Sequence, residues 1–267
     1  VTHPTKPGLK IPQMFEAAIN KELKGVWIIG EDIVQTDPNS AHVVEAMNSL
    51  ELLVVQEIFM SETAKLATVV LPGTTFLEKD GTFTNTERRV QRVNRAVPPL
   101  PGTKPDGVIV TDMMQKLGFD QPTYDADQVL AEIADIVPFF KGITRERLGK
   151  MGLQWPVKED GTDTQILHTE EFKLGKGRLK NFDWKESSEI EANHKEYPLI
   201  LTTSRVLQHY NAATMTRRTS NINIVDEDVL LIHPKDAANR DLNTGDIGRL
   251  YSGRGEVALK VEVTDKV

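Results

Sequence analysis

Gly30, Glu31 and Asp32 directly follow the first of three short apolar runs near the start of the sequence. Glycine allows a ligand to approach the backbone closely. The carboxylate of Asp32 can accept two parallel hydrogen bonds from the N–H and amino groups on one edge of guanine. Asp32 could instead only cap a loop or a helix, and the motif alone leaves both interpretations open. No G-x-G-x-x-G pattern follows this run, so the sequence lacks a nicotinamide-binding fingerprint.

The second and third apolar runs end in the same way. Gln56 and Glu57 follow the second run, and Gly73, Thr74 and Thr75 follow the third. If the runs are parallel strands, their carboxyl ends meet at one edge of the sheet, where ligands bind in such folds. We therefore expect a shared ligand edge, although strands that end in ordinary polar loops would produce the same pattern.

A second candidate site lies far along the chain, where Arg205, His209 and Tyr210 follow the apolar residues 197–201. An arginine can bind a phosphate through two parallel N–H donors, and His and Tyr add further donors. A single histidine can equally be structural, so both interpretations stand. The pair Arg217–Arg218 is either a further phosphate contact or a surface pair.

The remaining residues offer no reaction centre. Asp106 follows a Lys-Pro pair and suits a helix cap, with a ligand role as the alternative. No carboxylate pair or Ser-His-Asp set stands out, and the histidines, His3 among them, lack metal-ligand spacing. The absence of cysteine excludes disulfides, thiolate metal sites and iron–sulfur ligation within this stretch. By its own residues the chain predicts a binding surface with no catalytic residue and no metal site.

The bulk composition is typical of a folded, globular chain. Of the 267 residues, 39% are hydrophobic and 27% charged, and the length suits two domains. The net charge of −7 argues against nucleic acid as a partner. No stretch approaches the roughly 18 consecutive apolar residues of a membrane helix, so we expect no direct membrane insertion. The sequence lacks an initiator Met and a signal pattern, which favours a start inside a longer gene product.

Hydrophobic periodicity predicts the elements that position the candidate residues. Residues 11–72 alternate helical spacing with short apolar runs, which is typical of a parallel sheet with crossover helices. Further helices are expected over 108–117 and 126–137, and a small hairpin near 171–182. Short β-rich runs after residue 196 predict a small β-barrel. The expected strands are 26–29, 52–55, 68–71, 197–201, 229–232, 247–251 and 256–263. The expected divisions are an α/β domain over 1–137, a connecting segment over 138–195 and a barrel domain over 196–267.

Five stretches of the sequence look like consecutive blocks of one family, in that family's order. They are residues 27–37, 55–64, 67–72, 81–91 and 201–218. They are spread along most of the chain, which resembles the C-terminal part of the molybdopterin-dependent formate dehydrogenase alpha subunit. The resemblance implies an α/β fold with a Rossmann-like, three-layer domain around a parallel sheet. A six-stranded β-barrel of the double-psi type would follow, cut short after Val267.

The resemblance also implies cofactors and site residues. The full subunit would hold two molybdopterin guanine dinucleotides around molybdenum or tungsten, with a [4Fe–4S] cluster bound by an upstream part. Formate would be oxidised to CO2, and two electrons would leave through the cluster; this chain would cradle the dinucleotides and could not oxidise formate alone. The positions that match cofactor contacts are Gly30, Glu31, Asp32, Thr36, Glu57, Thr74, Asp106, Arg205, Val206, His209, Tyr210 and Asn211. The family usually has Trp after the residue at position 106, where this chain has Gly107.

Two alternatives remain within the resemblance. Some relatives are cofactor-free structural electron-transfer subunits of respiratory complexes, and others act on substrates such as nitrate. The expected partners are the upstream part of the same subunit and iron–sulfur electron-transfer subunits, without nucleic acid. A cytoplasmic location is expected, with a periplasmic one as the alternative.

Overall fold

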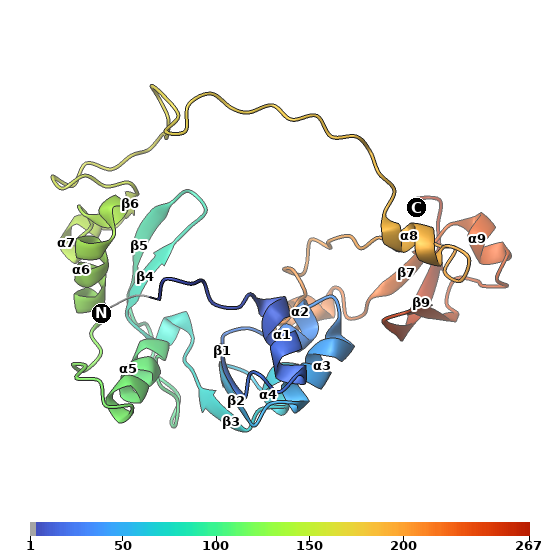
Figure 1. Ribbon diagram of the computed structural model, residues 1–267, viewed down its shortest axis with the longest axis horizontal. Helices are drawn as coiled ribbons and strands as arrows, with labels where there is room; N and C mark the ends of the chain where they lie inside the picture. The colour runs from blue at the N-terminus through green and yellow to red at the C-terminus, as the bar shows by residue number, and fades with distance from the viewer. Residues whose placement is uncertain (1–3) are drawn as a thin grey trace.

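A computed structural model describes residues 4–267, except for the side chains of Glu189 and Glu191. His3 and the first residues of the expected lead-in lie outside this range. A parallel sheet and its helices, here called the parallel-sheet part, occupy residues 11–72 (Figure 1). Its elements are α1 (Ile11–Ile19), β1 (Gly25–Ile29), α2 (Ile33–Thr36), α3 (Ser40–Asn48), β2 (Leu52–Glu57), α4 (Glu62–Lys65) and β3 (Val69–Pro72). The strands lie in the order β1-β2-β3 and are all parallel, which confirms the predicted sheet.

One face of this sheet packs against helices α1 to α4 in a single core. Leu53 and Val55 of β2 are buried there with residues of all four helices. The opposite face is open, since Ile29, Leu52 and Val69 are 42–49% exposed. Residues 11–72 therefore form two layers, and the expected third layer is not confirmed. The physical reason is the strand order: right-handed crossovers that always advance in one direction place their helices on the same face.

A second group of elements, here called the middle part, packs around an antiparallel sheet (Figure 1). It contains η1 (Phe76–Glu78), β4 (Gly81–Thr84), β5 (Arg89–Val93), α5 (Asp106–Lys116), α6 (Ala126–Ile136), η2 (Pro138–Phe140), α7 (Arg145–Leu148) and β6 (Leu153–Gln154). Helices α5 and α6 match the predicted helices closely. Ile143, Leu148 and Val157 are buried against Val90 and Leu130, so residues after position 138 share a core with α6 and β5.

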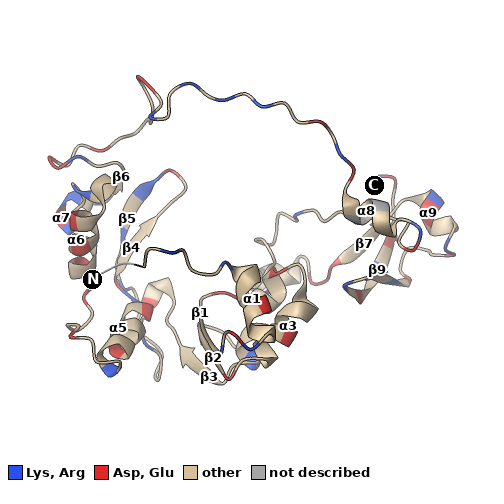
Figure 2. Ribbon diagram, viewed as in Figure 1, with Lys and Arg blue, Asp and Glu red and all other residues tan. Residues whose placement is uncertain are grey.

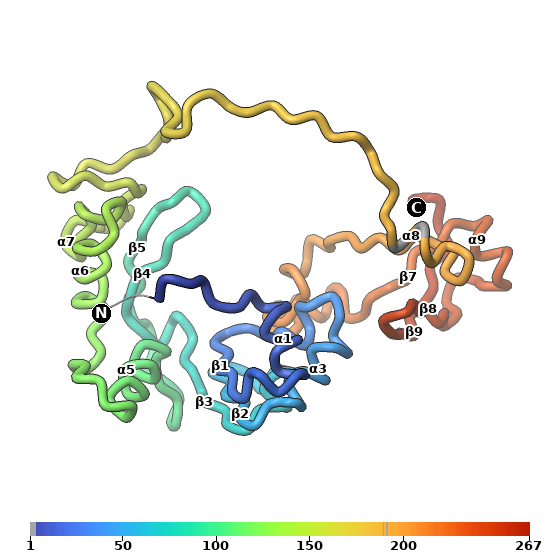
Figure 3. Tube along the Cα trace, in the orientation of Figure 1, coloured from blue at the N-terminus to red at the C-terminus, as the bar shows by residue number. Residues whose placement is uncertain are grey.

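An extended segment over residues 166–187 leads away from the middle part and ends at α8 (Ser188–Asn193) (Figures 1 and 3). The hairpin expected near 171–182 is wrong, because no strand forms there. A strand needs a partner, and the side chains of Leu174 and Leu179 are 99% and 100% exposed. Figure 2 shows Lys and Arg spaced along this segment.

The C-terminal part contains η3 (Thr216–Arg218), η4 (Ser220–Asn223), β7 (Val229–Ile232), α9 (Pro234–Ala238), β8 (Ile247–Ser252) and β9 (Gly255–Val263). Its three strands pair in the order β7-β9-β8 around a small core that includes Ile232 and Val261. They match three of the predicted runs. Residues 197–201 form no strand, which corrects that expectation, because no neighbouring strand pairs with them. The described residues thus show three strands here, and the six-stranded barrel is not confirmed.

Candidate functional site

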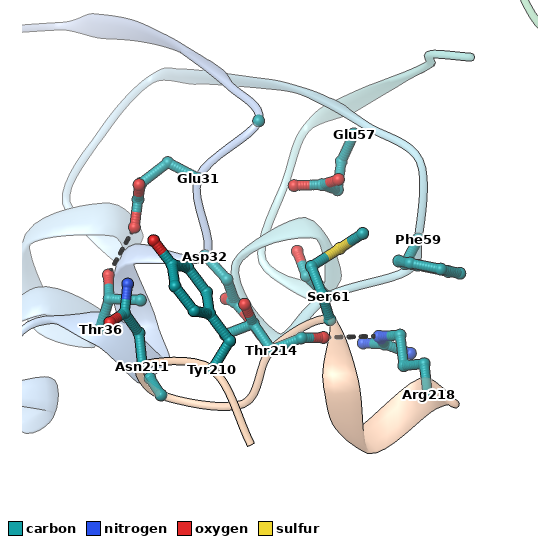
Figure 4. Close-up of a pocket in the computed structure, with 13 residues that line it drawn as sticks. Glu31, Asp32, Thr36, Glu57, Phe59, Ser61, Tyr210, Asn211, Thr214 and Arg218 are labelled. Carbon is teal, nitrogen blue, oxygen red and sulfur yellow. Dashed lines mark hydrogen bonds between the residues drawn. The ribbon is translucent and has the colours of Figure 1, made fainter. Parts of the chain in front are cut away.

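A cavity of about 230 Å³ lies where the parallel-sheet part meets the loop that precedes and includes η3 (Figure 4). One wall comes from the carboxyl ends of β1 and β2, and the other from residues 210–218. Its lining residues are Gly30, Glu31, Asp32, Thr36, Glu57, Phe59, Ser61, Tyr210, Asn211, Ala212, Thr214, Met215 and Arg218. The structure therefore brings together two stretches that are far apart in the sequence. The cavity is smaller than the roughly 300–1,000 Å³ of typical ligand pockets, so it suits one part of a larger ligand.

Asp32 is buried and only half of its carboxylate is satisfied. Its Oδ1 accepts hydrogen bonds from the backbone N of Thr63 at 2.9 Å and from Thr63 Oγ1 at 2.7 Å. Its Oδ2 is buried and has no hydrogen-bond partner. The side chain does not cap α2, which begins directly after it, but its Oδ1 accepts an N–H from the first turn of α4, so the helix-cap interpretation holds for this oxygen. A buried carboxylate oxygen without a donor is costly, and a ligand that donates hydrogen bonds would satisfy it.

Backbone geometry and two further acids shape the same wall of the cavity. Gly30 has a φ of 64°, a left-handed conformation that favours glycine. Its N–H donates to the carbonyl of Gln56 at 2.9 Å, which joins the ends of β1 and β2. The hydroxyl of Thr36 donates to Glu31 Oε1 at 2.6 Å, and Glu57 Oε1 accepts from the N–H of Ile58 at 2.7 Å. The wall thus carries three carboxylates and is rich in hydrogen-bond acceptors.

The loop on the opposite side is held in place by His209. Its buried ring lies 3.0 Å from Thr216 Oγ1 through Nδ1 and 2.7 Å from the carbonyl of Val225 through Nε2. Both ring nitrogens are therefore engaged inside the protein, and the ring positions Tyr210 and Asn211, which line the cavity.

Two other predicted residues of this stretch stand outside the cavity. The guanidinium of Arg205 donates to Asn211 Oδ1, and Val206 is exposed. They are close in sequence to the lining residues without forming the wall. Any contact of Arg205 or Val206 with a ligand stays a prediction.

Thr74 and Asp106 lie in a second polar cluster at the ends of β2 and β3. Gln56 Nε2 donates to Asp106 Oδ1 at 2.8 Å, and Lys79 pairs with the other carboxylate oxygen. Burial alone would raise the pKa of Asp106, but the hydrogen bonds from Lys79 and Gln56 outweigh it and lower the pKa. Gln56 Oε1 and Thr74 Oγ1 are buried without a partner. This cluster, like Asp32, contains buried polar atoms that have no partner within the described part of the chain.

Several lining residues could not be assigned from the sequence. Phe59, Ser61 and Thr214 carry no motif that separates them from ordinary loop residues, and only their position at the cavity identifies them. The sequence alone allows Arg218 to be either a phosphate contact or one of a surface pair. The structure separates the two arginines: Arg217 binds Asp228 at 2.9 Å, whereas Arg218 lines the cavity.

No three His, Asp or Glu side chains come together in the described part of the chain in an arrangement suited to a metal ion. No helix there has the length and apolar character needed to cross a membrane.

Comparison with known proteins assigns both ends of the chain to the same kind of protein. The family model described as molybdopterin oxidoreductase matches residues 2–116, and that of the molybdopterin dinucleotide binding domain matches residues 199–267. Together they cover more than half of the chain. The cavity described above is formed by residues from both matched regions.

Two curated relatives match nearly the whole chain. The F420-dependent formate dehydrogenase subunit alpha of Methanocaldococcus jannaschii is 41% identical over 264 residues, which are 97% of this chain and 39% of the relative. The F420-dependent formate dehydrogenase 2 subunit alpha of Methanococcus maripaludis is 41% identical over 266 residues, again 97% of this chain and 39% of the relative. The chain thus spans well under half the length of these relatives.

A solved structure has the same fold. Acetylene hydratase from Pelobacter acetylenicus superposes with a TM-score of 0.70 at 20% identity, over 95% of this chain and 37% of that protein. At this identity the likeness concerns the fold alone. With two family models that together match more than half of the chain, and relatives 41% identical over 97% of it, the chain belongs to the molybdopterin oxidoreductase family.

Proposed function

We propose that this chain is the dinucleotide-holding part of a formate dehydrogenase catalytic subunit. The observation that carries the proposal is the unpartnered Oδ2 of Asp32, which is buried at a cavity built from both matched regions. The names of the relatives support formate as the substrate. When bound, the molybdopterin group would supply the metal at which formate loses two electrons. The described residues would bind and orient the dinucleotide.

The polar atoms on the wall suit a guanine dinucleotide. Asp32 Oδ1 already accepts two hydrogen bonds, so Oδ2 would receive the donors of the guanine edge. Gly30 would allow the ring to approach the backbone, and Tyr210 and Asn211 would close the site from the opposite loop. Gln56, Thr74 and Asp106 would satisfy further polar groups of the cofactor at the neighbouring cluster. His209 would act by holding the loop.

The larger assembly is part of the same proposal. A second dinucleotide, the [4Fe–4S] cluster and the metal ligand would be bound by other parts of a longer subunit, and iron–sulfur subunits would receive the electrons. Further strands would complete the six-stranded barrel around β7, β8 and β9. We place the enzyme in the cytoplasm.

A cofactor-free structural subunit is the competing function. The buried oxygens of Asp32, Gln56 and Thr74 argue against it, because no group in the described part of the chain donates a hydrogen bond to them and a bound ligand would. Metal analysis of the full-length protein separates the two functions, since a structural subunit would contain iron and neither molybdenum nor tungsten. Parallel assays with formate and nitrate separate formate dehydrogenase from a nitrate reductase.

The test of the site is Asp32→Asn in the full-length subunit. The amide keeps the shape of the side chain but replaces a carboxylate oxygen by an N–H donor or a weaker acceptor. We expect the guanine nucleotide released per mole of purified protein to fall at least about tenfold, as for a lost charged hydrogen bond. Glu62→Gln is the matched control, because Glu62 is a partly exposed carboxylate on α4 that pairs with Lys65 and does not line the cavity. Wild-type nucleotide content in Asp32→Asn would rule out the proposed role.

A further inference from the structure

Arg218 connects the two walls of the cavity. It ends η3, and its Nε donates to the carbonyl of Thr214 at 3.1 Å within the same loop. Its guanidinium carbon lies 4.7 Å from the ring centroid of Phe59, which follows β2 in the parallel-sheet part. A guanidinium at this distance from an aromatic ring is held by a cation–π interaction. The side chain is therefore fixed in position by one contact from each side of the cavity.

Arg218 is also the only cationic side chain among the residues that line the cavity. The other charged lining residues are the carboxylates Glu31, Asp32 and Glu57. Among the described residues, no ion pair includes Arg218. Its two terminal nitrogens, unlike its Nε, donate no hydrogen bond within the described part of the chain. They remain available to an anion.

Arg218 lies on the side of the cavity opposite Asp32. Figure 4 shows Glu31, Asp32 and Thr36 on one side, with Glu57, Phe59 and Arg218 on the other. The side with Asp32 therefore offers acceptors, and the opposite side holds the cationic donor next to one carboxylate. A nucleotide has the same polarity, because its base presents N–H donors and its phosphates present acceptors.

We infer that Arg218 binds a phosphate of the cofactor's nucleotide and, through Phe59, couples this binding to the contact between the two walls. The inference rests on the proposed function and adds the direction of the nucleotide, with the base toward Asp32 and the phosphate toward Arg218. A guanidinium can form two parallel hydrogen bonds to a phosphate, which a lysine cannot. The ring of Phe59 keeps the planar group oriented for this geometry.

The experiment compares the full-length subunit with Arg218→Gln, Arg218→Lys and the matched control Arg217→Gln. The control removes the neighbouring arginine, which pairs with Asp228 outside the cavity. The readout is guanine nucleotide and molybdenum or tungsten per mole of protein, after washing at low and at high NaCl. We expect Arg218→Gln to retain about tenfold less nucleotide after the high-salt wash, because a charged hydrogen bond is lost. Arg218→Lys should lie between this variant and wild type, and Arg217→Gln should match wild type.

Two results would overturn the inference. One is wild-type retention in Arg218→Gln, and the other is an equal loss in Arg217→Gln, which would indicate a general effect of charge or folding.

Phe59→Leu tests the coupling between phosphate binding and the contact of the two walls. The coupling is wrong if nucleotide retention stays unchanged in that variant. If Asp32→Asn loses the nucleotide while Arg218→Gln keeps it, the inference fails and the proposed function stands. If both variants keep it, both fail.

Discussion

Thr63 is the residue that decides how the carboxylate of Asp32 is presented. Its side chain is fully buried, and both its N–H and its hydroxyl donate to Asp32 Oδ1. The same hydroxyl oxygen accepts from the N–H of Val34 at 3.1 Å. One hydroxyl thus ties the end of β1, the start of α2 and the first turn of α4 together. The free Oδ2 of Asp32 is a consequence of this arrangement, since Thr63 occupies only the other oxygen.

We predict that Thr63→Val lowers the free energy of unfolding by about 1–3 kcal/mol, whereas Thr63→Ser stays close to wild type. Valine has the shape of threonine, but it leaves a buried carboxylate with one donor fewer and the N–H of Val34 without an acceptor. Serine keeps the hydroxyl and removes only a methyl group. Urea unfolding of the three proteins measures the difference. Equal stability of the valine and serine variants would contradict this role of the hydroxyl.

At the scale of elements, hydrophobic periodicity predicts the helices and strands that are determined by residues close together in the sequence. The strands of the parallel sheet, helices α5 and α6, and strands β7 to β9 all follow from local apolar patterns. Residues 197–201 and the hairpin near 171–182 were predicted wrongly, because a strand also needs a distant partner that no local pattern reveals. The contact between the Tyr124 ring and Gly107 could likewise not be predicted from the sequence, since it depends on how a loop folds back on α5.

The contact between Gly107 and Tyr124 leads to a prediction about α5. A Cβ at position 107 would lie 2.1 Å from Tyr124 Cε2, far inside contact distance. The ring thus fills the space beside Gly107, where a side chain would have to lie. We predict that Gly107→Ala destabilises the protein by about 1–3 kcal/mol through overpacking. Tyr124→Ala should remove most of this penalty when the two changes are combined, whereas Tyr124→Phe, which keeps the ring, should not.

A double-mutant cycle from urea unfolding measures this coupling. Alanine is the better helix former, so a purely local effect would make Gly107→Ala neutral or stabilising. A stabilising Gly107→Ala, or additive effects of the two substitutions, would show that the ring does not limit position 107.

At the scale of the molecule, the candidate site depends on a contact that the sequence could only suggest. The strand ends at Gly30–Asp32 and the stretch after Arg205 were both recognised from their residues. Their meeting at one cavity required the path of the chain in three dimensions (Figure 3). The chain between them runs through the middle part and the exposed segment 166–187. This segment makes no strand or helix, and the Arg218–Phe59 contact joins the C-terminal part to the parallel-sheet part.

This arrangement predicts where trypsin cuts first. The segment contains basic residues at Lys173, Lys176, Arg178, Lys180 and Lys185, and an exposed backbone without regular hydrogen bonds is cleaved most readily. Arg249 is the internal reference, because it is as accessible in side chain but lies in β8, where it pairs with Glu256. Mass spectrometry over a short digest should detect cleavage between 173 and 185 well before cleavage at 249. The two products should elute together in gel filtration, since the cavity contacts lie outside the cut. Earlier cleavage at 249, or separation of the products under native conditions, would mean that the segment is protected or that the walls of the cavity do not hold together.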